Sequence, residues 1–162
     1  MYTPFGKKQR DNLLTLANLG DKMLDALRPV VEKVPNTVIE RVKSSGTGEN
    51  KKSFSAYNPD YARKTGKSGH KDFWISGTMW GSYQIVKEEV TGTGVSFTLG
   101  TTDGKGSDGQ FLSDIHSAER KKHKRGGTQG EGQLILGITD EEWEKLQNQM
   151  MEALRKEFDK YL

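Results

Sequence analysis

The chain has 162 residues, of which 32% are hydrophobic and 19 are glycine, so we expect one domain, residues 1–162, with a small core and large loops. Its 25 basic and 22 acidic residues leave a net charge of +3, which excludes a histone-like excess of positive charge. The absence of cysteine excludes disulfides, thiol catalysis and cysteine-bound zinc, as expected of a protein made in a reducing cytoplasm. No apolar run is long enough to predict a membrane span or a signal peptide.

The first third of the chain predicts helix over residues 8–43. Apolar residues recur there every three or four positions, which places them along one face of a helix. Pro29 lies inside this pattern and lacks a backbone N–H, so we expect a kink or a stop near Leu27 and Arg28. A second, shorter helix is expected after the next proline, over residues 36–43.

The middle of the chain is rich in glycine, since 17 of the 19 glycines lie between Gly46 and Gly137. Helices should be scarce there and turns frequent. Within residues 72–100, "YQIVKEEV" and "GVSFTLG" alternate apolar and polar residues and predict an antiparallel hairpin that turns at "TGTG". The alternating apolar residues are Tyr83, Ile85, Val95, Phe97 and Leu99. Residues 44–71 and 101–133 are expected to form long loops.

The last segment, residues 139–162, predicts the clearest helix. Thr139 and Glu142 have the spacing of a capping box, in which each side chain bonds an otherwise unpaired backbone N–H. One apolar face then follows, made of Trp143, Leu146, Met150, Leu154, Phe158 and Tyr161. We therefore expect an α+β fold in which long N-terminal and C-terminal helices pack on a small antiparallel sheet, with long glycine-rich basic loops.

Catalytic and metal-binding patterns are missing from the sequence. "ARKTGKSG" is not a phosphate-binding loop, because Tyr61 stands where the pattern requires its first glycine. The three histidines, His70, His116 and His123, have no metal-ligand spacing. The segment "SGTMWGS" has no nucleophile-elbow pattern. We therefore expect no enzyme, no cofactor and no metal site.

Two basic segments are the candidate binding sites. The run "AERKKHKRGG" contains Arg120, Lys121, Lys122, Lys124 and Arg125. A second basic loop, residues 51–71, has six basic residues and one acidic residue, a net charge of about +5, and includes Lys51, Lys52, Arg63, Lys64 and Lys67. Three interpretations of the first run stay open: a solvated loop, a loop that contacts a partner or faces a DNA-filled channel, and a nucleic-acid-binding element. The run has no interleaved aromatic residue for base stacking.

The segment "KDFWISGTMWGSYQI" contains two tryptophans, Trp74 and Trp80, close to other large apolar residues. Aromatic side chains usually lie in the core. They are also enriched at the centre of subunit interfaces, and a small sheet does not easily cover so many of them. Both tryptophans are therefore candidates either for the core or for an interface with a neighbouring subunit.

Several short motifs occur in a recognisable order. The loop "YNPDYARKTGKSG" leads to the turn "SGTMWGS" and the hairpin, and then to "DIHSAERKKHKRGG" and the final "LILGITDEEWEKL". This order resembles the virion morphogenesis and tail-completion proteins of tailed bacteriophages. The positions that match the motifs of that family are Ser76, Gly77, Met79, Ser82, Ile115, His116 and 136–141.

The resemblance implies a structural protein of the phage head-to-tail junction, located at the neck or tail of the virion and made in the cytoplasm of the bacterial host. Its implied partners are other copies of itself in a ring, the portal or adaptor protein and the tail, with non-specific contact to DNA in the channel and none to a membrane. The family is similar to this chain in having a small antiparallel sheet packed by terminal helices. A small basic nucleic-acid-binding protein is the alternative, based on the two basic segments.

Overall fold

The structure is a computed structural model that describes residues 18–67, 69–73, 77–92, 94–102, 121–122, 128–129 and 131–160. Its helices are α2 (Leu19–Val31), α3 (Val34–Ser45), α4 (Pro59–Thr65), α5 (Thr78–Gly81) and α7 (Asp140–Phe158). Its strands are β1 (Tyr83–Thr91), β2 (Gly94–Thr101), β3 (Lys121–Lys122) and β4 (Thr128–Gln129). The chain is therefore an α+β protein with a small antiparallel sheet, as predicted. Within the described ranges, no helix is both long and apolar enough to cross a membrane.

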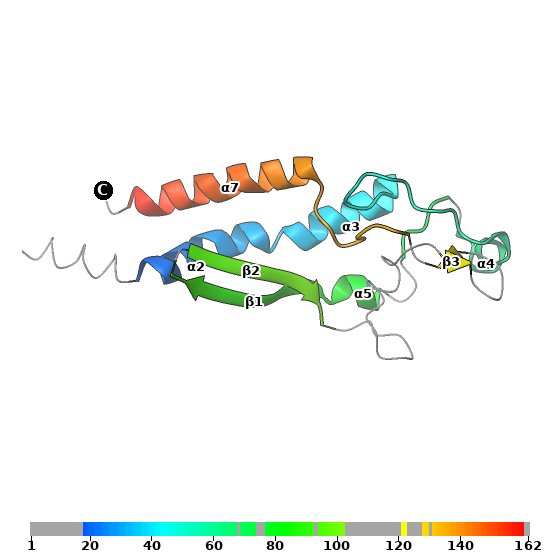
Figure 1. Ribbon diagram of the computed structural model, residues 1–162, viewed down its shortest axis with the longest axis horizontal. Helices are drawn as coiled ribbons and strands as arrows, with labels where there is room; N and C mark the ends of the chain where they lie inside the picture. The colour runs from blue at the N-terminus through cyan, green and yellow to red at the C-terminus, as the bar shows by residue number, and fades with distance from the viewer. Residues whose placement is uncertain are drawn as a thin grey trace, which may run out of the picture.

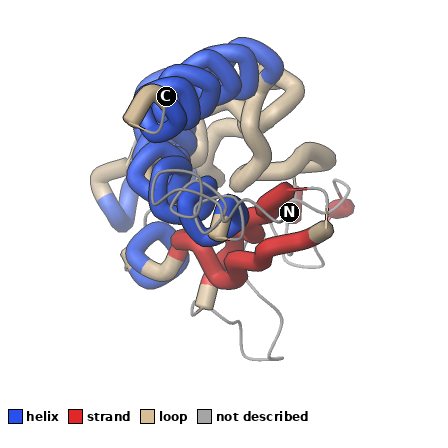
Figure 2. The backbone as a smooth tube through the Cα atoms, turned by 90° about the vertical axis from the view of Figure 1, so that its left-hand side faces the viewer, coloured by secondary structure: helices blue, strands red, loops and turns tan. Residues whose placement is uncertain are grey.

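Helix α2 forms the middle layer at one end of the molecule. It packs against α7 on one side and against both strands of the β1–β2 hairpin on the other (Figure 1). Figure 2 shows the same order from the end, with the helices at the top and centre and the strands below them. Helix α3 continues from α2 beneath the start of α7. We call α2, α3, α7 and the β1–β2 hairpin the body.

The break between α2 and α3 lies later than predicted. Helix α2 includes Pro29 and continues to Val31, so the stop expected near Leu27 and Arg28 does not occur. A proline inside a helix removes one hydrogen bond, and packing on both faces of α2 offsets that loss. The break instead precedes Pro35, whose ring would clash with the carbonyl of Val31 four residues earlier if the helix continued. Residues 8–17 of the predicted helix lie outside the described residues.

The predicted hairpin is confirmed, and it contains one irregularity. Strand β1 pairs antiparallel with β2 from Tyr83 opposite Thr101 to the turn. Val86 has no partner in the register and forms a bulge, which reverses the alternation of side chains beyond it. As a result Glu88 faces α2, where its carboxylate accepts a hydrogen bond from the Arg28 guanidinium at 2.7 Å. That hydrogen bond lowers the pKa of the Glu88 carboxyl.

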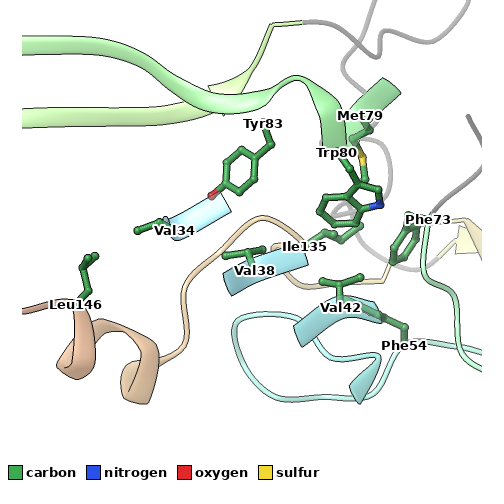
Figure 3. Close-up of a cluster of buried hydrophobic side chains, with 10 residues drawn as sticks. All are labelled: Val34, Val38, Val42, Phe54, Phe73, Met79, Trp80, Tyr83, Ile135 and Leu146. Carbon is green, nitrogen blue, oxygen red and sulfur yellow. The ribbon is translucent and has the colours of Figure 1, made fainter. Parts of the chain in front are cut away.

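The core lies where α3, α5, the start of β1 and the segment before α7 meet. Val38, Val42 and Ile135 are completely buried, and Trp80 and Met79 from α5 lie close to them (Figure 3). The full buried cluster is Val34, Val38, Val42, Phe54, Phe73, Met79, Trp80, Tyr83, Ile135 and Leu146. The valines recur every four residues along α3, and this spacing places them in one buried row.

Helix α7 begins with the predicted capping box. The Thr139 hydroxyl accepts a hydrogen bond from the Glu142 N–H at 3.3 Å, and the Glu142 carboxylate accepts one from the Thr139 N–H at 2.9 Å. Leu146 is buried as expected, but Trp143 is 45% exposed, so its assignment to the covered face is wrong. Helix α7 is an outer layer that packs against α2 and contacts α3, and this packing covers a narrower stripe than the sequence pattern indicates. Tyr161 lies outside the described residues.

The segment predicted as a loop over residues 44–71 is largely ordered. It contains the helix α4 and two isolated bridges, Thr47 with Ser53 and Ala56 with His70. The Asn58 side chain accepts hydrogen bonds from two backbone N–H groups at the start of α4, which explains why a helix forms in a region of few apolar residues. We call residues 46–67 and 69–73 the arm. Of the other predicted loop, residues 103–120, 123–127 and 130 lie outside the described residues.

Candidate functional site

The base of the arm is fixed to the end of α3. Gly46 ends that helix in the left-handed conformation, with φ of 63°, and a Cβ at this position would lie 2.2 Å from the His70 ring. His70 in turn lies with Nε2 3.1 Å from the Lys43 carbonyl in the last turn of α3. Phe54 and Phe73 meet edge to face at 5.0 Å and place the arm's apolar residues in the core. Glycine is therefore required at position 46 both for its backbone angle and for space.

Arg41 joins four separate segments of the chain. Its Nε donates a hydrogen bond to the Glu142 carboxylate at 3.0 Å, next to the α7 capping box. Its Nη1 donates to the Thr47 carbonyl at 2.8 Å, and its Nη2 donates to the Gly137 carbonyl at 2.5 Å. The Arg41 and Glu142 side chains are only 11% and 15% exposed, so this charge pair is largely shielded from water, and each of the three guanidinium nitrogens of Arg41 donates a hydrogen bond. One guanidinium thereby fixes α3, the arm, the segment before α7 and α7 itself.

A second buried ion pair connects the arm to the segment before α7, residues 131–139, which we call the closing segment. The Glu131 side chain is 1% exposed, and its carboxylate lies 2.9 Å from the Lys71 ammonium. The same carboxylate accepts hydrogen bonds from the Ser55 N–H at 3.0 Å and from the Ser55 hydroxyl at 2.8 Å. A buried carboxylate requires such partners, because an unpaired charge in the interior costs several kcal/mol, about 3–5 when one partner is removed.

The outer part of the arm depends on polar contacts around Tyr57. Its hydroxyl donates a hydrogen bond to the Asp72 carboxylate, which also lies 2.7 Å from the Lys67 ammonium. The Lys67 ammonium lies 5.4 Å from the centre of the Tyr57 ring, and Tyr61 packs beside that ring at 5.3 Å. Burial and the Asp72 hydrogen bond raise the pKa of Tyr57. Helix α4 itself has no buried residue, so this network positions a helix that the core does not hold.

Carboxylates neutralise part of the positive charge of the second basic loop. Lys51 pairs with Glu141 of α7, Arg63 pairs with Asp60, and Lys67 pairs with Asp72. Three of the five candidate cations in this loop therefore have a carboxylate partner within the chain. The other two, Lys52 and Lys64, are exposed and have no ion-pair partner among the residues that the structure describes.

The first basic run is described only in part. Lys121 and Lys122 form strand β3, which pairs with β4 through Lys121 opposite Gln129 and Lys122 opposite Thr128. A short ladder therefore lies inside the segment that was predicted as a loop. Arg120, Lys124 and Arg125 lie outside the described residues.

The structure places one of the two candidate tryptophans, Trp80, in the core. Trp80 is 2% exposed, and its indole N–H donates a hydrogen bond to the Asp72 carbonyl at 3.1 Å. It belongs to the core, so within this chain it offers no surface to a neighbouring subunit. A buried indole needs such a hydrogen-bond acceptor, and the base of the arm supplies it. Trp74 lies outside the described residues.

The motif of residues 136–141, at the start of α7, contacts several other parts of the fold. The Leu136 carbonyl accepts a hydrogen bond from the Tyr83 hydroxyl at 2.9 Å, the Gly137 carbonyl accepts one from Arg41, and Thr139 caps α7. Gly137 has no room for a side chain, since a Cβ there would lie 2.6 Å from the Glu49 side chain. The sequence predicted the cap but not the contacts of Arg41, because an arginine on an amphipathic helix normally faces water.

Among the residues that the structure describes, no group of three or more histidine, aspartate or glutamate side chains is placed to hold a metal ion. The shielded Glu142 and Glu131 carboxylates bond to Arg41, Lys71 and backbone N–H groups, whereas the buried Glu49 Oε2 has no hydrogen-bond partner among the described residues. The chain matches no protein-family model, no curated protein and no solved structure. We take the arm as the candidate functional site, because its helix α4 has no buried residue and polar contacts hold it in position.

Proposed function

We propose that this chain is a structural protein of the phage head-to-tail junction, whose copies form a ring that links the portal or adaptor protein to the tail. The order of motifs supports this proposal, from "YNPDYARKTGKSG" through "SGTMWGS" to "LILGITDEEWEKL". In the proposed role the chain performs no catalysis. It supplies surfaces of fixed shape on which neighbouring subunits assemble.

The single observation that carries the proposal is the exposed and ordered arm. Helix α4 buries none of its residues, yet the Tyr57 network and the Asn58 cap hold it beyond the end of the body. Apolar burial contributes most of the stability of a small domain, and α4 adds little of it. A helix that is positioned without being buried is suited to contact another molecule, and a neighbouring subunit in a ring offers such a contact.

Buried polar contacts at the base of the arm support the same interpretation. Ion pairs such as Lys71 with Glu131 add little net stability, because desolvation of the two charges offsets their attraction. Their geometry is restrictive, however, since each partner has defined hydrogen bonds. In the proposed role these pairs fix the direction in which the arm extends, and an assembly subunit depends on that direction.

Location in the virion tests the proposal directly. An antibody against the chain, used with gold label in electron microscopy of phage particles from cells that express it, should mark the neck. An antibody against the major capsid protein is the control and should mark the head. Particles without label, from cells in which the chain is detected, would contradict the proposal.

The alternative function is non-specific nucleic-acid binding, and the exposed Lys52 and Lys64 favour it. Such binding releases counterions, so affinity for duplex DNA should fall steeply as salt increases from about 50 mM. The double variant Lys52→Ser/Lys64→Ser should then bind more weakly than the control Lys33→Ser/Lys145→Ser, which removes two exposed cations from α7 and from the break before α3. No binding by the wild-type chain at low salt would exclude this alternative.

A further inference from the structure

The two strands of the hairpin have different outer edges. Strand β1 carries the bulge at Val86 and three consecutive charged residues, Lys87, Glu88 and Glu89. Strand β2 reads "GVSFTLGT" over eight residues, with no charge and no proline. Bulges and charges are the usual devices that keep an edge strand from pairing with another chain. Strand β1 has both devices, and β2 has neither.

The outer edge of β2 has no partner in the described part of the chain. Among the described residues this sheet consists of β1 and β2, and the other pair, β3 and β4, forms a separate sheet. In an antiparallel pair every second residue directs its backbone N–H and C=O away from the partner strand. Strand β2 therefore presents a row of backbone donors and acceptors along an edge of eight residues, which is longer than a typical strand of 5–6 residues.

The side chains of β2 divide into two sets that matter for pairing. Val95, Phe97 and Leu99 lie on the face toward α2 and are only half-buried. Ser96 and Thr98 lie on the opposite face and are exposed. A further strand along β2 would cover more of the first set, and cross-strand pairs of aromatic and branched side chains stabilise sheets.

We propose that β2 pairs antiparallel with β2 of a second copy of this chain, which gives a four-stranded sheet in the order β1–β2–β2–β1. An uncharged strand fits its own copy, because a twofold contact places the same residues on both sides. Addition of β2 to the outer edge of β1 is disfavoured by the bulge and the charges there. Pairing therefore stops at two copies, and the sheet does not extend into a fibre.

The register follows from the requirement that apolar side chains stay on one face. A twofold axis at Phe97 places Val95 opposite Leu99 of the second copy and Ser96 opposite Thr98 of the second copy. This arrangement joins the apolar residues of the two β2 strands into one continuous row on the face toward α2, whereas a slip by one residue would place apolar residues opposite polar ones. The inference concerns the β2 edge alone and does not depend on the proposed function in the virion.

Two double variants of the whole chain test both the pairing and its register. In Ser96→Lys/Thr98→Lys the proposed register sets positive charges opposite each other, and the dimer dissociation constant should rise by about tenfold or more. In Ser96→Lys/Thr98→Glu the same positions set opposite charges against each other, and the dimer should persist. Gln84→Lys, an exposed position on β1, is the control and should leave the dimer intact.

Sedimentation equilibrium measures the mass over a range of concentrations, and circular dichroism checks that each variant is folded. The wild-type chain should reach twice the 18.1 kDa mass of one chain. A wild-type chain that stays at 18.1 kDa at its highest soluble concentration would overturn the proposal. A folded Ser96→Lys/Thr98→Lys variant that remains as dimeric as the wild type would overturn it equally, because pairing would then not involve β2.

Discussion

The body and helix α4 of the arm are held in position by different kinds of contact. In the body, Val38 and Val42 of α3 are completely buried against Ile135, and α7 closes over them. In the arm, two phenylalanines at its base join the core, but no residue of α4 is fully buried, and the position of α4 depends on Asp72 and its hydrogen-bond partners. Apolar burial contributes about 25 cal/mol per Å² and does not depend on direction, whereas hydrogen bonds and ion pairs contribute little net energy but require defined geometry. Apolar packing of the body and of the base of the arm therefore supplies most of the stability, whereas polar contacts set the position of α4.

The largest expected effect comes from the centre of the core. Replacing Ile135 by alanine should lower the free energy of unfolding by about 3–4 kcal/mol, because it leaves a cavity at a completely buried site. Urea unfolding, followed by tryptophan fluorescence, to which the buried Trp80 contributes, measures the change. The control Leu134→Ala, at the adjacent position that is 59% exposed, should change stability by about 0.5 kcal/mol or less. Equal losses in the two variants would show that the closing segment is not part of the core.

The next effect tests the contact between body and arm. Arg41→Ala should cost about 3 kcal/mol, because the shielded Glu142 carboxylate and two carbonyls lose their donor. Arg41→Lys should recover little of this loss, since one ammonium cannot reproduce three directed hydrogen bonds. Thermal unfolding compares both variants with Arg155→Lys on the exposed side of α7. If Arg41→Lys is as stable as the wild type, the positive charge at this position is sufficient, and the three hydrogen bonds of the guanidinium are not required.

The stability of the folded chain should depend on pH through the buried phenol of Tyr83. Burial raises the pKa of Tyr83 to about 12 from its usual 10.0, opposed by the Arg41 charge and supported by Glu142. The folded chain therefore holds the phenol proton more tightly than the unfolded chain does. This contribution to stability is full below pH 10 and is lost as pH rises toward about 12.

Stability of the wild type should therefore fall by about 2–3 kcal/mol more than that of Tyr83→Phe over this pH interval. Lysines titrate in both proteins, so their effect cancels in the difference. Denaturant unfolding at several pH values measures it. A difference between the two proteins that does not change with pH would contradict the assignment to the Tyr83 phenol.

The smallest effect is expected in the arm. Tyr57→Phe removes the hydroxyl that bonds Asp72 and should change global stability by only about 0.5–1 kcal/mol. Hydrogen exchange of the Ala62 amide, which bonds the Asn58 carbonyl in α4, should accelerate, while amides of α3 should stay unchanged. Tyr61→Phe is the control, since its hydroxyl has no hydrogen-bond partner among the described residues. Faster exchange throughout α3 would show that the arm and the body unfold as one unit.

Local sequence patterns predicted the elements whose causes are local. The alternation of Val95, Phe97 and Leu99 gave the hairpin, and Thr139 with Glu142 gave the start of α7. The α4 helix was missed because its seven residues have no apolar stripe, although Asn58 before a proline was a usable signal for a helix start. For the second basic loop, the sequence predicted the run of positive charges but not the carboxylates that pair with three of them. The partners of Lys51 and Lys67 lie 90 and five residues away along the chain.

By itself, the sequence determined the α+β class, the hairpin and its turn, the cap of α7 and the absence of cysteine chemistry. These features depend on residues within a few positions of one another, where periodicity and capping act directly. The tertiary structure alone decided that Arg41 and Glu131 are shielded and bonded, that Trp80 is core, and that the Val86 bulge turns Glu88 toward Arg28. Such contacts join residues far apart in the chain, and their geometry exists only after α3, the arm and the closing segment have packed together.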